Sequence, residues 1–157
     1  MKNILITGGA GLVGSVLTKG LKDKFNISIL DIKKVDGVDS HTGDISNIDS
    51  IMPAFKGIDT VVHLAAISND PIGNMFKKQT YDINVKATKK LIDCCSKFKV
   101  KNFIFASSCS VYGFTKKICS EKSKVKPLTA YAKSKVIVEN YLQKNFKYNS
   151  TCLRFAT

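Results

Sequence analysis

The stretch that decides the fold is Thr7-Gly8-Gly9-Ala10-Gly11-Leu12-Val13-Gly14, which joins an apolar, strand-like run to an amphipathic, helix-like one. Its glycine spacing permits a tight turn after the strand, a close approach of the backbone to a phosphate, and close packing of the helix on the strand. The free amides at the helix N-terminus favour an anion. The stretch therefore predicts a dinucleotide-binding turn whose contacts are Gly8, Gly11, Leu12, Val13 and Gly14.

An acidic residue closes the next predicted strand, over 27–31, at the distance that the dinucleotide fingerprint requires. The carboxylate of Asp31, with Ile32 beside it, can accept hydrogen bonds from both hydroxyls of the adenosine ribose. It would repel a 2′-phosphate, which favours NAD over NADP. Lys33 and Lys34 follow directly and weaken that preference, so NADP stays the less favoured alternative.

Two further predicted strand ends belong to the same crevice, because ligands of open α/β sheets lie outside the carboxyl ends of the strands. Asp44 and Ile45 follow one strand and can bracket the adenine. The stretch His63-Leu64-Ala65-Ala66 closes another strand with small residues that let the backbone approach a cofactor. We predict cofactor contacts at Asp44, Ile45, Leu64, Ala65 and Ala66, and a structural role for His63.

Short apolar runs alternate with longer amphipathic stretches along the whole chain, which predicts an α/β fold. We expect a Rossmann-type doubly wound parallel sheet of about six strands with helices on both faces. The predicted strands cover 2–7, 27–31, 59–64, 102–107 and 150–155, and a short strand within 38–45 ends at Asp44. The predicted helices cover 12–24, a short stretch from an N-cap at Ser46 to Phe55, 80–98 and 129–146, and a lysine-rich surface loop covers 114–127.

The 157 residues suit one domain, and their composition excludes several classes of site. The five cysteines form no Cys-x-x-Cys pair and the two histidines have no ligand cluster nearby, so neither a disulfide framework nor a metal site is expected. No run approaches the ~18 apolar residues of a membrane span, and the apolar run at 4–6 is too short for a secretory signal. We therefore expect a cytoplasmic protein with no membrane partner.

The net charge of +13 raises the question of nucleic-acid binding. The basic residues are spread along the chain, and Arg154 is the single arginine among 25 lysines and arginines. Specific nucleic-acid recognition usually relies on arginine. A solvated, lysine-rich surface is therefore the favoured interpretation. A nucleic-acid binder would require a steep salt dependence of its affinity.

A candidate catalytic group lies in the helix predicted over 129–146. Tyr131 and Lys135 are four residues apart, so they share one face of that helix. An ammonium near a phenol favours the phenolate and lowers a pKa that is ordinarily about 10. Tyr131 is thereby predicted to act as an acid or base near neutral pH. A serine hydroxyl at the strand end 107–108 can orient the substrate oxygen that Tyr131 deprotonates.

With these residues in place, the chain resembles the extended short-chain dehydrogenase/reductase superfamily, and most closely its NAD-dependent nucleotide-sugar epimerase/dehydratase branch. The resemblance rests on the turn over 7–14, Asp31, Asp44-Ile45, His63–Ala66, Asp82-Ile83-Asn84-Val85, Ser107–Gly113, Tyr131–Lys135 and Leu153-Arg154-Phe155, in family order. It implies an epimerase or oxidoreductase that moves a hydride between a nucleotide-sugar and NAD. It also implies roles for four residues: Tyr131 as base, Lys135 as the lysine that tunes it and holds the nicotinamide ribose, Ser108 as the residue that orients the substrate hydroxyl, and Asn84 as part of the cofactor site.

One departure from the family narrows the chemistry. The 4,6-dehydratases carry an Asp-Glu pair where this chain has Cys109 and Ser110, which supply neither the acid nor the base for eliminating water. The dehydratase reaction is therefore disfavoured. A nucleophilic role for Cys109 is the less favoured alternative to an inert thiol.

Family members continue beyond the position of Phe155 into a further strand and a C-terminal domain that binds the nucleotide-sugar. We therefore expect residues 1–157 to form the NAD-binding Rossmann domain without that substrate domain, with the sixth strand at a sheet edge. We expect weak or no turnover from the chain alone. The alternative is a non-catalytic NAD-binding module. A homodimer through the two long helices is an expectation from the family alone.

Overall fold

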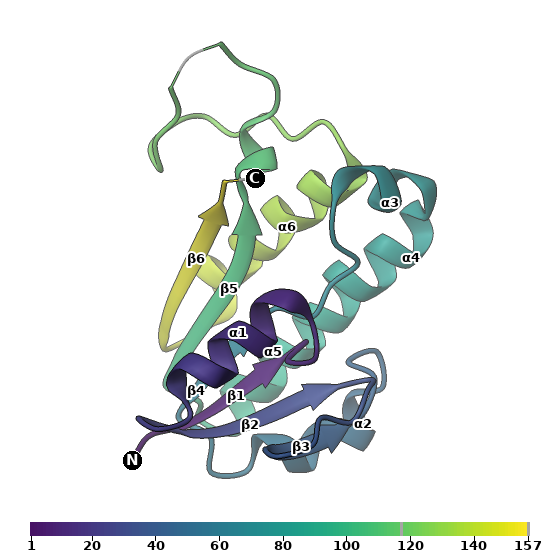
Figure 1. Cartoon of the computed structure of the whole chain (residues 1–157). Coiled ribbons are helices and arrows are strands. Elements are labelled where there is room, and N and C mark those ends of the chain that lie inside the picture. The colour runs from purple at the N-terminus through teal and green to yellow at the C-terminus, as the bar shows by residue number, and fades with distance from the viewer. Residues whose placement is uncertain (117, 157) are drawn as a thin grey trace.

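Six parallel strands form one sheet in the order β3-β2-β1-β4-β5-β6 (Figure 1), which confirms the predicted Rossmann-type architecture. The structure is a computed structural model that describes residues 1–116 and 118–156. The strands are β1 (Asn3–Thr7), β2 (Asn26–Asp31), β3 (Asp39–Thr42), β4 (Thr60–His63), β5 (Asn102–Ser108) and β6 (Asn149–Phe155). The helices are α1 (Leu12–Leu21), α2 (Ile48–Ile51), α3 (Asp70–Met75), α4 (Lys77–Tyr81), α5 (Thr88–Lys97) and α6 (Ala130–Asn145), with 3-10 turns at Met52–Phe55 and Cys109–Tyr112 and a π-helical turn at Asp82–Ala87.

The sheet is buried on both faces because its central strands are almost entirely apolar. Neighbouring residues of a strand point to opposite faces, so Leu5 of β1 packs toward α5 and α6 while Ile6 packs toward α1. Both side chains are fully buried. Figure 1 shows α1 on one face of the sheet and α5 and α6 on the other, which agrees with the prediction of helices on both faces.

The strand order reverses between β1 and β4, and this reversal determines where a ligand can bind. From β1 the chain continues to β2 and β3 on one side, then crosses to β4, β5 and β6 on the other. The connections leave β1 and β4 in opposite directions and open a crevice at their carboxyl ends. The Gly-rich turn follows β1 at this point.

The helix predicted over 80–98 begins earlier and is not uniform. It consists of α4, the π-helical turn and α5, in sequence. The π turn contains Asn84, whose side chain hydrogen-bonds the backbone of the distant Ile67. Single π turns are often found at functional sites. Periodicity could not show this turn, because the apolar spacing of the helix continues through it.

Three other predicted details were wrong or incomplete. The N-cap of α2 is Asn47 rather than Ser46, because the Asp44 carboxylate accepts a hydrogen bond from the Ser46 amide at 2.8 Å and holds it in the preceding turn. The third strand ends at Thr42, before Asp44. Helix α3 was not predicted at all.

The predicted surface loop and the predicted edge strand agree with the structure, whereas the helix predicted over 12–24 ends at Leu21. The stretch 114–127, apart from residue 117, contains no helix or strand. β6 lies at one edge of the sheet, and Phe155 at its end is 45% exposed. No helix among the described residues is long and apolar enough to cross a membrane.

Candidate functional site

A cavity of about 690 Å³ runs along the carboxyl ends of β1, β2, β4 and β5, within the size range of small-molecule and cofactor sites. The structure brings fifteen of the sixteen residues predicted for binding or catalysis to its wall. They are Gly8, Gly11, Leu12, Val13, Gly14, Asp31, Ile32, Asp44, Ile45, Leu64, Ala65, Ala66, Ser108, Tyr131 and Lys135. Residues that the sequence did not single out also line it, among them Gly43, Ile67, Ser68 and Ala106.

The Gly-rich turn lines this cavity, and the neighbouring backbone leaves no room for a side chain at Gly8 or Gly14. Gly8 has a φ of +72°, and a Cβ there would lie 2.7 Å from the amide nitrogen of Ala65. A Cβ on Gly14 would lie 2.5 Å from the Gly8 carbonyl oxygen. Gly11 caps α1 without a side-chain hydrogen bond, and the first turn of α1 has no acidic residue. The first amides of α1 therefore stay available to an anion, as a pyrophosphate requires.

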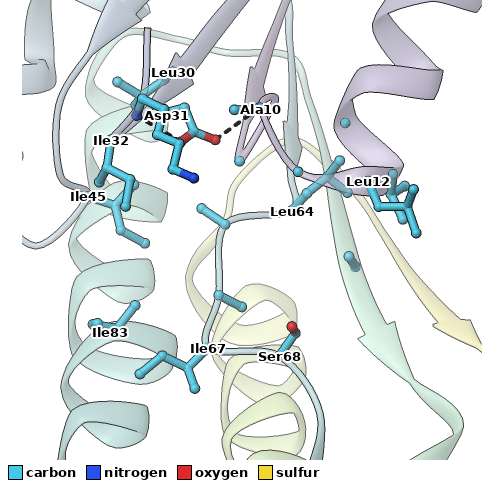
Figure 2. A pocket seen from close by; sticks show the side chains of 18 of the residues that line it. Ala10, Leu12, Leu30, Asp31, Ile32, Ile45, Leu64, Ile67, Ser68 and Ile83 are labelled. Carbon is cyan, nitrogen blue, oxygen red and sulfur yellow. Dashed lines mark hydrogen bonds between the residues drawn. The ribbon is translucent and has the colours of Figure 1, made fainter. Parts of the chain in front are cut away.

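Asp31 both holds the turn and faces the cavity. Figure 2 shows its carboxylate reaching the backbone of Ala10, whose amide donates to Oδ2 at 3.0 Å. The Lys33 amide donates to Oδ1 at 3.1 Å. Each carboxylate oxygen has a further lone pair, so both can still accept from ribose hydroxyls. The geometry suits the adenosine end of a dinucleotide.

The structure describes all sixteen predicted residues, and Asn84 is the one among them that does not line the cavity. Its side chain is buried, accepting from the Ile67 amide at 2.8 Å and donating to the Ile67 carbonyl at 2.9 Å. It also donates to the Ser134 hydroxyl at 3.4 Å. Asn84 thus shapes the segment after β4 that lines the cavity, where the resemblance implied that it lined the site directly.

His63 is a structural residue, as predicted. Its ring is 2% exposed, bonded to the Thr7 hydroxyl at 2.7 Å through Nδ1 and to the Thr88 hydroxyl at 3.0 Å through Nε2. The rings of Phe103 and Phe105 pack beside it. Burial, with a smaller contribution from the charge of Lys135, lowers the pKa of His63 to about 3. The ring is therefore neutral and ties β1, β4 and α5 together.

Lys135 lies in the cavity wall beside Tyr131, and its side chain is almost wholly buried. Its Nζ lies 5.2 Å from the ring centroid of Tyr131 and 4.8 Å from that of Phe105, and it donates to the Ala106 carbonyl at 2.7 Å. Burial lowers the pKa of Lys135 to about 8, while the Glu139 carboxylate opposes that fall. Since about 8 still lies above 7, Lys135 carries its charge at neutral pH.

Tyr131 differs from its prediction in one respect. We expected its pKa to fall beside Lys135, and in the structure the pKa is raised. Burial of the phenol is the main cause; a hydrogen bond with Ser108 lowers the pKa, and the charges of Asp70 and Cys109 raise it. The Lys135 ammonium donates to Ala106 and lies over the ring, so it does not reverse the effect of burial.

A buried ion pair beneath the site was not predicted. Glu139 accepts from Arg154 at two points, from Nε at 3.0 Å and from Nη2 at 2.7 Å, and from the Ser107 hydroxyl at 2.5 Å. Arg154 also donates to the Tyr112 hydroxyl at 3.0 Å. The chain's single arginine thus forms a bidentate pair that joins β6 to α6, a geometry that lysine cannot provide.

Comparison with known proteins identifies the family. Residues 4–157 match the NAD dependent epimerase/dehydratase family, nearly the whole chain. The chain belongs to this family. The predicted family and its cofactor, NAD, are thereby confirmed at the level of the family. No group of three or more His, Cys, Asp or Glu side chains that could hold a metal ion is found among residues 1–116 and 118–156.

Curated relatives of this family member are sugar epimerases and a dehydratase. The chain is 35% identical to N-acetyl-alpha-D-glucosaminyl-diphospho-ditrans,octacis-undecaprenol 4-epimerase of Escherichia coli O157:H7 over 143 residues, 90% of this chain and 43% of that protein. It is 31% identical to UDP-glucose 4-epimerase GEPI42 of Cyamopsis tetragonoloba, covering 88% of this chain and 45% of that protein. It is 30% identical to the dTDP-D-glucose 4,6-dehydratase of Dictyostelium discoideum, covering 94% of this chain and 41% of that protein. The chain spans about half the length of the curated relatives it matches.

Solved structures agree with this assignment. MoeE5 in complex with UDP-glucose and NAD superposes with a TM-score of 0.89 at 28% identity, covering 98% of this chain and 54% of that one. UDP-glucose 4-epimerase from Brucella ovis in complex with NAD gives a TM-score of 0.90 at 26% identity, covering 98% and 51%. The fold of the described residues is therefore the NAD-binding fold of these enzymes.

Proposed function

We propose that this chain carries the cofactor-binding and proton-transfer part of an NAD-dependent epimerase that acts on a nucleotide-sugar. The observation that supports this most is the shared wall of one cavity. The Gly-rich turn, Asp31, Ser108, Tyr131 and Lys135 all line it. A dinucleotide bound there would place its pyrophosphate at the helix N-terminus.

The residues present fit NAD by their chemistry. The amides at the start of α1 would hold the pyrophosphate, and the Asp31 carboxylate would accept from the adenosine ribose. Leu64, Ala65 and Ala66 add small or apolar side chains to the cavity wall. When bound, NAD supplies a hydride acceptor that can later return the hydride to the sugar.

Three side chains of this chain would handle the proton. The Ser108 hydroxyl orients a sugar hydroxyl, and the phenolate oxygen of Tyr131 takes its proton while the carbon loses a hydride, which leaves a ketone. Return of the proton by Tyr131, with the hydride delivered to the opposite face, would invert that carbon. The Lys135 charge would stabilise the phenolate that burial otherwise disfavours. Cys109 and Ser110 provide no acid–base pair for losing water, so we favour epimerisation over dehydration.

Cofactor binding tests the first half of this proposal. We expect saturable heat release when NAD is titrated into the chain in a calorimeter, and weaker binding of NADP because of Asp31. Asp31→Ala should reduce the preference for NAD. An absence of saturable NAD binding by the folded chain would contradict the proposal.

Turnover tests the second half. Because the chain spans about half the length of its relatives, we expect weak or no epimerisation of UDP-glucose by the 157 residues alone. In any form of the protein that turns over, Tyr131→Phe should abolish epimerisation without abolishing NAD binding, whereas the control Tyr148→Phe should do neither. Full activity of the Tyr131→Phe variant would contradict the role of Tyr131 as the base, whereas NAD binding without turnover in every form of the protein would favour a non-catalytic NAD-binding module.

A further inference from the structure

Helix α3, which connects β4 to the rest of the site, packs directly against the start of α6. A Cβ on Gly73 would lie 2.9 Å from the Cβ of Tyr131, so α3 and α6 are in contact at Tyr131 itself. The Asn74 side chain accepts from the Ala130 amide at 3.0 Å. The position of Tyr131 is therefore determined partly by α3.

Asp70, the first residue of α3, joins two parts of the site. Its Oδ1 accepts from the hydroxyl of Thr129, the residue that caps α6 by accepting from the Ala132 amide at 3.0 Å. Its Oδ2 accepts from the Ser110 hydroxyl at 3.0 Å. Thr129 and Ser110 lie 59 and 40 residues away in the chain, so one carboxylate links the start of α6 to the turn after β5.

The link continues from Ser110 to the phenol. The Ser108 hydroxyl donates to the Ser110 hydroxyl at 3.1 Å, and Ser108 also shares a hydrogen bond with Tyr131. The hydrogen bond with Ser108 lowers the pKa of Tyr131, whereas the negative charge of Asp70 raises it. Asp70 is therefore connected to the phenol both through this line of hydroxyls and through its charge.

We propose that Asp70 is a positioning residue of this site, which ties the start of α6, where Tyr131 lies, to Ser110 and Ser108 on the turn after β5 and holds a negative charge near the phenol. This inference rests on the proposed function, because it concerns the group proposed as the base. Asp70 does not line the cavity and acts through the two serines. Neutralising Asp70 by Asp70→Asn would remove that charge and replace one of its two accepting oxygens with a donor.

The charges around Tyr131 are few, so the contribution of Asp70 can be measured. Lys135 on α6 favours the phenolate, while Asp70 on α3 and Cys109 after β5 oppose it. The Ser108 hydroxyl is the neutral partner. Removing the negative charge of Asp70 should therefore lower the pKa of Tyr131.

The test is a pH titration of the full 157-residue chain labelled with ¹³Cζ-tyrosine and followed by NMR, without NAD or sugar. Tyr131→Phe assigns the Tyr131 signal. We expect Asp70→Asn to move the titration of Tyr131 to lower pH. The matched control is Asp93→Asn, since Asp93 accepts from the Tyr141 hydroxyl at 2.7 Å and contributes to raising the pKa of Tyr141 to about 12. It should lower the pKa of Tyr141 and leave Tyr131 unchanged.

Two further variants separate positioning by charge from simple loosening. Asn74→Ala removes a contact between α3 and α6 without changing charge, and should lower the melting temperature but not the pKa of Tyr131. Ser110→Ala removes the acceptor of the Ser108 hydroxyl, which is then free to donate to Tyr131, and should lower that pKa even if Asp70→Asn fails to fold. The inference is overturned if Tyr131 titrates unchanged in Asp70→Asn or Ser110→Ala, or if Asn74→Ala shifts it as much. Because no ligand is present, these outcomes are independent of whether the chain binds NAD.

Discussion

Replacing Lys135 with methionine is expected to change how the stability of the fold depends on pH. Burial lowers the pKa of Lys135 from 10.5 to about 8, although Glu139 opposes it. Each pKa unit corresponds to about 1.4 kcal/mol, so keeping this ammonium charged costs the folded state about 3 kcal/mol at pH 7. Between pH 8 and 10.5 the unfolded chain binds a proton that the folded chain does not, so stability rises with pH. Methionine has a similar volume and no charge, so that rise should disappear.

The assay is urea unfolding followed by circular dichroism, since the chain has no tryptophan. Between pH 7 and pH 9.5 the wild type should gain about 2 kcal/mol relative to Lys135→Met. Comparing the two pH values cancels the fixed cost of leaving the Ala106 carbonyl without its donor, about 1–3 kcal/mol. Lys133→Met, at an exposed position two residues away, is the control and should run parallel to the wild type. Parallel curves for Lys135→Met would refute the reasoning.

Substitutions at Arg154, at Gly14 and Gly20, and at Thr129 also have expected outcomes. Arg154→Ala leaves the buried Glu139 carboxylate without its cation and should cost about 3–5 kcal/mol in urea unfolding, with partial recovery in Arg154→Lys; a loss below about 1 kcal/mol would contradict the buried pair. Gly14→Ala should abolish NAD binding because its Cβ would meet the turn, whereas Gly20→Ala, with open space around it, should stabilise α1 by about 1 kcal/mol in the same unfolding assay. Thr129→Ala should cost about 1 kcal/mol through the loss of the α6 cap, and Thr129→Ser should restore it; equal stability of both variants would argue against the cap.

The parts of the fold that follow from local chemistry could be predicted. Buried parallel strands need continuous apolar runs, and the turn after β1 needs glycine, so the parallel sheet and the cavity's main residues could be inferred before the structure. Helix α3 could not be inferred from periodicity, because Asp70, Pro71 and Gly73 are typical of turns. A signal was nevertheless present: Asn69 is a good N-cap, its side chain accepting from the Ile72 amide, and proline is favoured in the first helical turn.

The electrostatics of the site depend on burial and on contacts between distant segments, which spacing along a helix does not show. The four-residue spacing of Tyr131 and Lys135 correctly places both on the cavity wall. It could not show that Lys135 donates to the Ala106 carbonyl or that burial raises the pKa of Tyr131. Asp70 comes from an element that was not predicted, so its contribution to the site could not be foreseen.

The neutral ring of His63 also sets the acid limit of the fold. Its pKa falls from 6.5 to about 3. Between pH 6.5 and pH 3 the unfolded chain therefore binds a proton that the folded chain does not bind, and the fold loses stability as the pH falls. The accumulated loss approaches about 5 kcal/mol, comparable with the 5–15 kcal/mol that holds a typical domain together. An acid titration followed by circular dichroism would give the pH at which the chain unfolds. The His63 imidazole would then account for much of the sensitivity of the fold to acid.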